Sequence, residues 1–331
     1  MRIAAFLAVS IALTGLVQAQ EPFKGKTITV YVGASAGGGY DTYGRLVARH
    51  IGRFLPGEPT VIAGNVPGGF GVAAANFLYN VAPKDGTALG VLVQTVAEEQ
   101  VLRGDAIQYD AAKFGWVGRM APNVELACVW HSVPVKRFED LQQRETIFAG
   151  QGAAAVSYPT LLNRLLDTRI KLVRGYRSTA SVRLAMEQGE VEGMTGSLDV
   201  ISAAAPDWVS DGKVNILLQY QHERHPNLAN VPAVLELIRS SEDRDIFSFF
   251  IGSATVGRSI VAPPGVPPEQ LALLRRAFDD MLRDEQFVDE AKQAKIQLGP
   301  LPGTALQAIV ERQIDVSPAI RDRIVALGRR H

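Results

Sequence analysis

A strand that leads through a glycine-rich loop into a helix is the feature of this sequence that most constrains its fold. Residues Thr27–Val32 (TITVYV) are β-branched or aromatic and predict a strand. Four glycines, three of them consecutive, lie within Gly33–Gly39, and the next segment has an apolar face at helical spacing. The order strand, tight loop and helix is typical of proteins in which helices cover a parallel sheet.

The same order is repeated before residue 93. Thr60–Ala63 predicts a second strand, Asn65–Gly69 a turn, and the apolar residues from 74 to 81 a second helix. Pro83–Gly86 is a further turn, and Ala88–Val93 predicts a third strand. Strands that alternate with helices over short connections predict a doubly wound, mostly parallel sheet.

A second unit of the same kind follows. Its expected strands are Ala127–Trp130, Thr146–Ala149, Ile170–Val173, Val191–Met194 and Val214–Tyr220. Its expected helices are Tyr158–Leu166 and Thr179–Gln188, and the C-terminal helices are Glu269–Arg283 and Ala305–Arg330, with an interruption near Pro318. A length of 331 residues suits two domains. The pattern leaves open whether the two units are independent domains or lobes that the chain crosses twice.

The N-terminus has the layout of a secretory signal peptide. Arg2 supplies a positive charge, Ile3–Leu16 is an apolar run, and Val17–Ala19 resembles a cleavage site. The alternative is a membrane anchor, but the apolar run is shorter than the ~20 residues that span a bilayer. We expect residues 1–19 to be removed near Ala19 during export.

Charge and cysteine content exclude several classes of function. The chain has 34 Lys and Arg residues and 34 Asp and Glu residues, so no basic surplus favours nucleic acid as a partner. Cys128 is the only cysteine, which excludes an internal disulfide and a cysteine-based zinc site. It lies in an apolar stretch, where an inert buried thiol is expected, and we expect no cofactor.

The loop Ser35–Asp41 is the first candidate site. Glycines such as Gly37 and Gly38 let a backbone approach a ligand closely, and a helix N-terminus offers free N–H groups and a partial positive charge. A carboxylate or phosphate would suit this site. The loop lacks the phased glycines of a dinucleotide-binding motif. The alternative is a tight turn that simply needs glycine.

The same loop also matches the G-x-S-x-G nucleophile elbow through Gly33, Ser35 and Gly37. A secreted serine hydrolase is therefore an alternative function. The elbow normally follows several strands, whereas this loop follows the first, and the five histidines lack the context of a triad base. We expect no catalytic residue and interpret Ser35 as a hydroxyl that binds a ligand.

Three further loops follow predicted strands. They are Asn65–Gly71, Gly150–Ser157 and Gly175–Thr179. Ligands of open α/β sheets bind at the carboxyl ends of strands, so loops that face one another would line a cleft with backbone donors. Arg177 could pair with a carboxylate or lie in solvent, and Ser178 or Thr179 could simply cap a helix. The pair His222 and His225 has metal-like spacing without a third ligand nearby, so we expect no metal site.

Four motifs in order resemble the receptors of tripartite tricarboxylate transporters, the TctC or Bug family, over nearly the whole mature chain. These motifs are Ala36–Asp41 with Arg45, Asn65–Gly71, Pro83–Leu89 and Ala262–Pro267. The resemblance implies a two-lobed periplasmic-binding-protein type II fold, with each lobe a mostly parallel sheet flanked by helices. Lobe 1 would comprise residues 20–123 and 248–331, and lobe 2 residues 124–247. The crossings would lie near Met120–Val129 and Phe247–Ile260, with the C-terminal helices on lobe 1.

The resemblance also implies the function and the site. It implies a monomeric periplasmic receptor that captures a small organic carboxylate and delivers it to membrane permease subunits. A ligand sensor for a two-component system is another alternative. From the residues and the resemblance together, we expect the ligand-binding residues to be Ser35, Gly37, Gly38, Tyr40, Asp41, Gly68, Ser157, Tyr176, Arg177, Thr179 and Asp199. Asp41 could instead orient its loop or cap its helix.

The sequence departs from the family pattern at several positions. Ala36 replaces a proline, and Tyr176-Arg177-Ser178 replaces a turn that normally contains glycine. The loop Gly150–Ser157 is rich in alanine, and Phe247–Ser259 lacks the usual W-x-G pattern. These departures concern the identity of the ligand more than the fold.

Overall fold

Two separate β-sheets carry the strands of this protein. The computed structural model describes residues 21–150, 152–176, 178–296 and 298–328, so the expected signal peptide lies outside the described residues. A six-stranded sheet has the order β11-β4-β10-β3-β1-β2, and a five-stranded sheet has the order β7-β6-β8-β5-β9. The strands are β1 (Thr27–Val32), β2 (Thr60–Asn65), β3 (Ala88–Val91), β4 (Gly115–Ala121), β5 (Glu125–Trp130), β6 (Thr146–Gly150), β7 (Ile170–Arg174), β8 (Gly193–Ser197), β9 (Val214–Gln219), β10 (Arg258–Ala262) and β11 (Leu301–Pro302).

Helices surround both sheets. The α-helices are α1 (Gly39–His50), α2 (Val72–Asn80), α3 (Val96–Arg103), α4 (Asp140–Gln143), α5 (Ala154–Leu165), α6 (Thr179–Glu187), α7 (Leu198–Ala204), α8 (Pro206–Ser210), α9 (Ser241–Val256), α10 (Pro268–Met281), α11 (Glu285–Gln293), α12 (Gly303–Ile314) and α13 (Pro318–Gly328). Short 3-10 helices are η1 (Ile51–Phe54), η2 (Gly69–Gly71), η3 (Gly104–Ala106), η4 (Ala111–Lys113), η5 (Pro226–Leu228) and η6 (Val234–Glu236).

Each sheet is mixed, which differs from the expected mostly parallel pairing. Strand β1 runs parallel to β2 and β3, and β6 runs parallel to β7 and β8. The antiparallel pairs involve β10 with β3 and β4, β11 with β4, and β5 with β8 and β9. Several of the antiparallel strands are those that lead the chain into or out of a sheet. A strand that enters a sheet from the other half of the molecule can pair antiparallel without a crossover helix.

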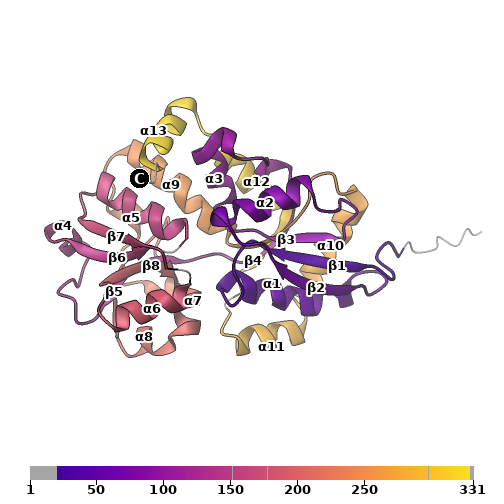
Figure 1. Cartoon of the computed structure of the whole chain (residues 1–331), viewed down its shortest axis with the longest axis horizontal. Helices are drawn as coiled ribbons and strands as arrows, with labels where there is room; N and C mark the ends of the chain where they lie inside the picture. The colour runs from indigo at the N-terminus through magenta and orange to yellow at the C-terminus, as the bar shows by residue number, and fades with distance from the viewer. Residues whose placement is uncertain (1–20, 151, 177, 297, 329–331) are drawn as a thin grey trace, which may run out of the picture.

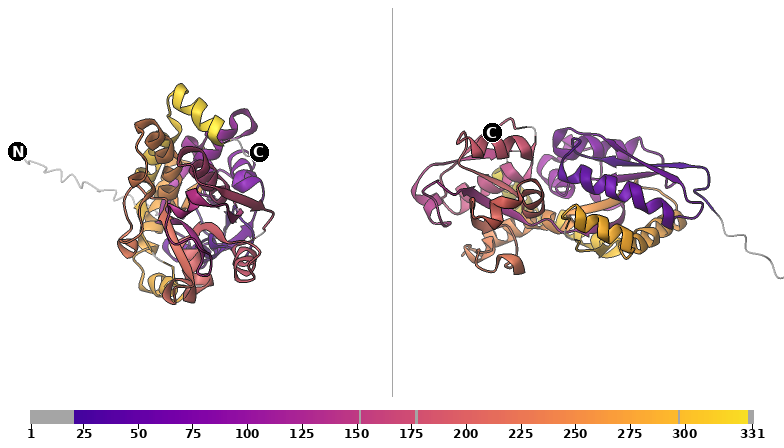
Figure 2. Two further views of the ribbon diagram at one scale, coloured as in Figure 1. Left: turned by 90° about the vertical axis from the view of Figure 1, so that its left-hand side faces the viewer. Right: turned by 90° about the horizontal axis from the view of Figure 1, so that it is seen from below.

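The two sheets form two halves that lie side by side (Figure 1). We call the half that contains β1 the first lobe and the half that contains β5 the second lobe. The chain passes directly from β4 in the first sheet to β5 in the second, and returns from β9 through α9 to β10. Figure 2 shows α10 and α11 beneath the N-terminal elements of the first lobe, although they follow the second lobe in the sequence.

Every second side chain of β1 is buried, and these side chains pack against α1 in the first lobe. Ile28, Val30 and Val32 of β1 are fully buried, and the apolar face of α1 covers them. Gly44 faces the strand, where an added Cβ would lie only 2.6 Å from Cγ2 of Val32. A larger residue at that position would push α1 away from the sheet and displace the loop that precedes the helix.

The C-terminal helices were expected on the first lobe, and the last of them contacts both lobes. Helix α12 packs along β4, as that expectation requires. Helix α13 packs against α3 of the first lobe as well as against α5 and α9, and its fully buried Ile324 lies in one apolar cluster with Val101, Leu161 and Phe250. The second lobe therefore receives part of its core from the end of the chain. Among the described residues, no helix combines the length and apolar character needed to cross a bilayer.

Candidate functional site

The predicted loops gather at two edges that face the boundary between the lobes. Because β1, β2 and β3 are parallel and in register, their carboxyl ends share one edge of the first sheet. The carboxyl ends of β6, β7 and β8 share one edge of the second sheet in the same way. Figure 1 shows both edges at the middle of the molecule. Each edge also presents helix N-termini, from α1 and α2 on one side and α5 and α6 on the other.

Asp41 holds the first loop together. Its Oδ2 accepts hydrogen bonds from the Gly37 N–H at 2.8 Å and from Nε of Arg45 at 2.9 Å. Its Oδ1 accepts from Nδ2 of Asn65 at 2.9 Å, and Asn65 also donates to the Ala34 carbonyl. Burial raises the pKa of Asp41, but these donors outweigh burial and lower it below the usual value. Asp41 therefore orients the loop and is not its helix cap, because Gly38 occupies the N-cap position.

The network of Asp41 leaves the rest of the loop open. Ser35, Gly37 and Gly38 are exposed at the interlobe edge. Gly37 has a φ of +79°, a conformation that favours glycine, whereas Gly38 has an ordinary φ of −91°. The first N–H groups of a helix lack intrahelical acceptors. The loop therefore leaves a hydroxyl and backbone groups at a helix N-terminus exposed, which are the features that the predicted anion site requires.

The second turn lies beside the first loop because Asn65, at the end of β2, bridges the two. Gly68 is exposed and has a φ of +133°. Phe70 follows with 42% of its surface exposed. Gly71, the residue before α2, approaches the side chain of Val93 so closely that an added Cβ would lie 2.5 Å from it. Glycine is therefore favoured at Gly37 and Gly68 by the backbone conformation, and at Gly71 also by the lack of space for a side chain. All three positions lie at the same edge of the first sheet.

Two of the predicted ligand residues of the second lobe, Ser157 and Tyr176, hydrogen-bond to other side chains of the protein. Ser157 is buried in α5, and its Oγ donates to Oε1 of Glu98 in α3 at 3.3 Å. The hydroxyl of Tyr176 donates to Oε1 of Glu190 at 2.6 Å, and partial burial together with this bond raises the pKa of Tyr176 to about 12. These two side chains bind other parts of the protein in this arrangement.

The fourth loop begins α6 with a defined cap. Ser178 is the N-cap residue and forms a capping box with Ser181, so Thr179 is the first residue of the helix. Of the two capping candidates, Ser178 is the one that caps. Arg177, the predicted partner of a ligand carboxylate, lies outside the described residues.

A buried polar cluster joins the two lobes next to these loops. We use the name interlobe cluster for Tyr40, Tyr43, Gln94, Asn123, Glu125, Ser197, Asp199 and Arg258. One guanidinium nitrogen of Arg258 lies 3.2 Å from Oγ of Ser197 and 3.4 Å from Oδ2 of Asp199. The same carboxylate oxygen accepts from the hydroxyl of Tyr43 at 3.3 Å. Asp199, expected to meet the ligand, thus binds first-lobe side chains.

Tyr40 supports this cluster with its ring. The guanidinium carbon of Arg258 lies 4.3 Å from the centre of the Tyr40 ring, within the range of a cation–π contact. The Tyr40 hydroxyl accepts from the Gln94 N–H at 3.0 Å. Burial raises the pKa of Tyr40, and the nearby Arg258 lowers it in part. The predicted ligand residue Tyr40 is therefore engaged with Arg258 and with the end of the third strand.

Glu125 is the second carboxylate of the interlobe cluster. Its Oε1 accepts from Nδ2 of Asn123 at 2.6 Å and from Nε2 of Gln94 at 3.2 Å. Burial raises the pKa of Glu125 to about 7, although the positive charge of Arg258 acts in the opposite direction. Its charge therefore changes near neutral pH, which is unusual for a glutamate.

Sequence reasoning missed Arg258, Glu125, Asn123 and Gln94. A signal was present for Arg258, because a charged residue stands between two apolar runs, Phe247–Val256 and Ser259–Ala262. A charge in such a segment is either buried and paired or functional. The contacts that pair it come from distant segments, which no local pattern reveals.

The serine elbow receives no support from the geometry. His50 contacts Glu290 and Arg53, and His225 caps a short helix, so neither is held against Ser35. Among the described residues, no group of three or more His, Cys, Asp and Glu side chains could hold a metal ion. Burial raises the pKa of Cys128 to about 12, which disfavours a nucleophilic role.

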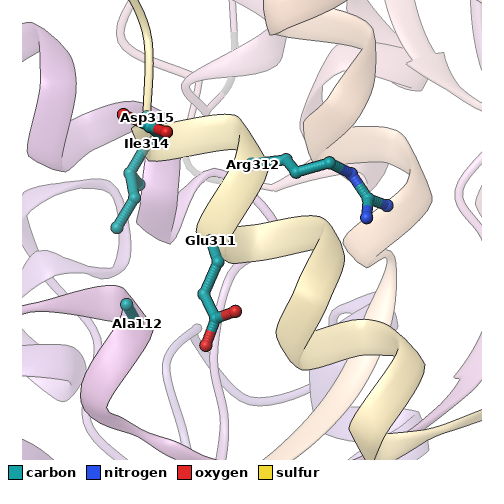
Figure 3. A pocket seen from close by; sticks show the side chains of 5 residues that line it. All are labelled: Ala112, Glu311, Arg312, Ile314 and Asp315. Atoms are coloured by element: carbon teal, nitrogen blue, oxygen red, sulfur yellow. The ribbon is translucent and has the colours of Figure 1, made fainter.

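Two grooves lie elsewhere on the described surface, around α12. One is lined by Ala112, Glu311, Arg312, Ile314 and Asp315 (Figure 3). The other runs between α9, α12 and α13 and includes Phe249 and Gln313. Neither groove contains a predicted site residue. The convergence of loops and helix N-termini locates the candidate site better than these grooves do.

Comparison with known proteins gives a sequence relative and several proteins of the same fold. No protein-family model matches the sequence. The UPF0065 protein of Bordetella bronchiseptica is 25% identical over 286 residues, which cover 83% of this chain and 79% of the relative. A TctC solute-binding protein from Polaromonas, solved without ligand, is 19% identical with a TM-score of 0.63, covering 91% of this chain and 97% of that one.

Two further solved structures contain carboxylates. MatC of Rhodopseudomonas palustris with bound malate is 22% identical with a TM-score of 0.66, over 91% of this chain and 98% of MatC. Another R. palustris protein, with adipate, is 20% identical with a TM-score of 0.68, over 91% of this chain and 97% of that one. This chain is thus similar in sequence to the UPF0065 protein, and it shares the fold of the TctC solute-binding protein and of MatC.

Proposed function

We propose that this protein binds a small organic carboxylate between its two lobes and delivers it to the permease of a tripartite tricarboxylate-type transporter. The observation that carries the proposal is the convergence of glycine-containing loops and helix N-termini at the two sheet edges that meet between the lobes, with the loops of the first lobe exposed. Such termini favour an anion by about 0.3–1 kcal/mol each. The carboxylates in MatC and in the adipate-binding protein support the same class of ligand.

The location and architecture that we propose follow from this function. Residues 1–19 would direct export to the periplasm and be removed, and the mature chain would act as a monomer. We propose lobe 1 as residues 20–123 and 248–331 and lobe 2 as residues 124–247, with α13 in contact with helices of both lobes. The mass of the protein isolated from a periplasmic extract tests the removal of residues 1–19.

A ligand screen tests the function itself. Thermal unfolding would be followed with mono-, di- and tricarboxylates, amino acids and aromatic acids. We expect at least one carboxylate to raise the unfolding midpoint, because a ligand that binds only the folded state stabilises it. If neither the screen nor mass spectrometry of the purified protein revealed a bound acid, the proposal would be wrong.

The variant Gly38→Ala tests whether the first loop lies against the ligand. An added Cβ at Gly38 would meet nothing closer than the Ser35 carbonyl oxygen at 3.5 Å, and its φ suits alanine, so the fold should be retained. We expect the methyl group to weaken binding of the carboxylate found in the screen about tenfold or more, since it would occupy ligand space. Gly64→Ala, where a Cβ meets no atom within 4 Å, is the matched control.

Arg177→Ala tests the predicted guanidinium contact. If Arg177 pairs with the ligand carboxylate, its removal should raise the dissociation constant about tenfold or more, in keeping with a charge-assisted hydrogen bond of about 1.5–3 kcal/mol. Arg174→Ala removes an exposed arginine from the same segment and serves as the control. An unchanged dissociation constant for Arg177→Ala, measured by calorimetry, would remove Arg177 from the site.

A further inference from the structure

Arg258 connects the two lobes from within the molecule. It is the first residue of β10, where the chain re-enters the first sheet, and only 3% of its surface is exposed. Its guanidinium contacts Ser197 at the end of β8 and Asp199 in the first turn of α7, both in the second lobe. On the other side it faces the rings of Tyr40 and Tyr43 in α1 of the first lobe.

Asp199, in the second lobe, contacts two residues of the first lobe. Its Oδ2 accepts from Arg258 at 3.4 Å and from the Tyr43 hydroxyl at 3.3 Å. Helix α7 therefore binds both to the strand where the chain re-enters the first lobe and to the helix that follows the candidate ligand loop. Both contacts cross from one lobe to the other, so a movement that separated α7 from α1 and β10 would break them.

Arg258 and Asp199 form an ion pair, but not all of their polar atoms have hydrogen-bond partners. A buried guanidinium needs a partner charge, and Asp199 is the acidic group that Arg258 contacts directly. Yet Oδ1 of Asp199 and Nε of Arg258 are buried without a hydrogen-bond partner among the described residues. Movement of the lobes apart would let water reach both atoms and would offset part of the lost attraction.

We propose that Arg258 and Asp199 form an interlobe clasp that favours the closed arrangement of the two lobes. In this role Arg258 is a positioning residue, since it acts on the ligand loops through α1 and α7. The consequence for ligand affinity rests on the proposed function, because a ligand that binds the closed arrangement binds more weakly when that arrangement is less populated. The clasp itself requires no ligand.

The distance between the lobes in ligand-free protein tests the clasp. Cysteines would replace Lys84 on the first lobe and Lys171 on the second, both of which are exposed. Spin labels on them report the interlobe distance, and the native Cys128 is buried and should stay unlabelled. The variants to compare are Asp199→Asn, which removes the negative charge, and Tyr43→Phe, which removes only one hydroxyl.

We expect Asp199→Asn to shift the distance distribution toward longer values, and Tyr43→Phe to shift it in the same direction by less. Asp207→Asn is the matched control, since Asp207 pairs with Lys213 inside the second lobe. Circular dichroism verifies that each variant is folded. An unchanged distribution in folded Asp199→Asn and Tyr43→Phe would overturn the proposal, as would an equal shift in Asp207→Asn.

Arg258→Lys and Arg258→Met separate charge from packing. Lysine keeps the charge but cannot reach Ser197 and Asp199 with one planar group, so we expect a distribution between those of the wild type and Arg258→Met. Malate and adipate then serve as probes of affinity by calorimetry. A longer interlobe distance without binding of either probe would support the clasp while counting against those two ligands. Binding with unchanged distances would support the proposed function and overturn the clasp.

Discussion

Glu125 shows how the surroundings of one residue set its charge. The side chain is 6% exposed, and its nearest polar contacts are the neutral amides of Asn123 and Gln94. Arg258 favours its ionised form, and Asp199 opposes it. Burial exceeds these effects and raises the pKa to about 7. Part of the free energy of folding therefore depends on pH near neutrality.

Glutamine at position 125 should remove this dependence. Between the unfolded pKa of 4.5 and the folded pKa of about 7, the native state binds a proton that the unfolded state has lost. Stability that comes from this proton is present at low pH and is lost as pH rises toward 7. We expect Glu125→Gln to unfold with a flatter pH profile and to be more stable at pH 8 by up to about 3 kcal/mol.

Urea unfolding between pH 4.5 and pH 8 measures this effect. Glu145→Gln changes an exposed carboxylate and should follow the wild-type profile. A Glu125→Gln variant whose stability still fell over this range as steeply as that of the wild type would show that another group is responsible.

The candidate ligand residues show how far the sequence predicts a site. Glycines after strands identified the first loop, since the need for backbone freedom at Gly37 is a local property. The partners of Asp41 and Asp199 could not be predicted, because Asn65, Tyr43 and Arg258 come from other segments. A carboxylate at a helix start has the same local appearance whether it faces a ligand or the protein itself.

At the scale of elements, regular amphipathic segments were the predictable part. The first strand was predicted with its observed bounds, and most other expected strands were found within a few residues. Strands β4, β10 and β11 were not predicted, and neither were helices α3, α4, α7, α8, α9 and α11. The segment of α9 is apolar on several sides because it packs against both α12 and α13, so it lacks the period of a surface helix.

The contact of α13 with the second lobe gives an element-scale prediction. Ile324 is fully buried among side chains of α5 and α9, so Ile324→Ala should leave a cavity and lower the free energy of unfolding by about 2–5 kcal/mol. Ile62→Ala, at a side chain that is 50% exposed, is the control and should cost much less. Chemical denaturation measures both, and equal effects would contradict this packing of α13.

At the scale of the whole molecule, helices join the two cores. Helix α3 of the first lobe contacts α9, α12 and α13, and Glu98 within it accepts hydrogen bonds from Ser157 and Ser253. Each lobe has its own sheet and apolar clusters, but these contacts connect them on the side of the helices. We therefore expect the two lobes to unfold together.

Cys128 offers a direct measurement of this cooperativity. The thiol is fully buried in β5 of the second lobe, and its pKa of about 12 keeps it protonated. We expect no reaction with a thiol reagent in the native protein at pH 8. In urea, its labelling should have the same midpoint as the loss of helical circular dichroism. Labelling at a distinctly lower urea concentration would show that the second lobe opens alone.

The pairing of β4 with β10 bears on how the two-lobed architecture could have arisen by insertion of one domain into another. Ala121, the last residue of β4, is the register partner of Arg258, the first residue of β10. The polypeptide thus leaves the first lobe and returns to it at one point, with residues 122–257 between. A segment with adjacent ends can be inserted into a host domain, or excised from it, without a break in the host sheet. The second lobe has the topology of such a guest domain, whose final helix is supplied by its host.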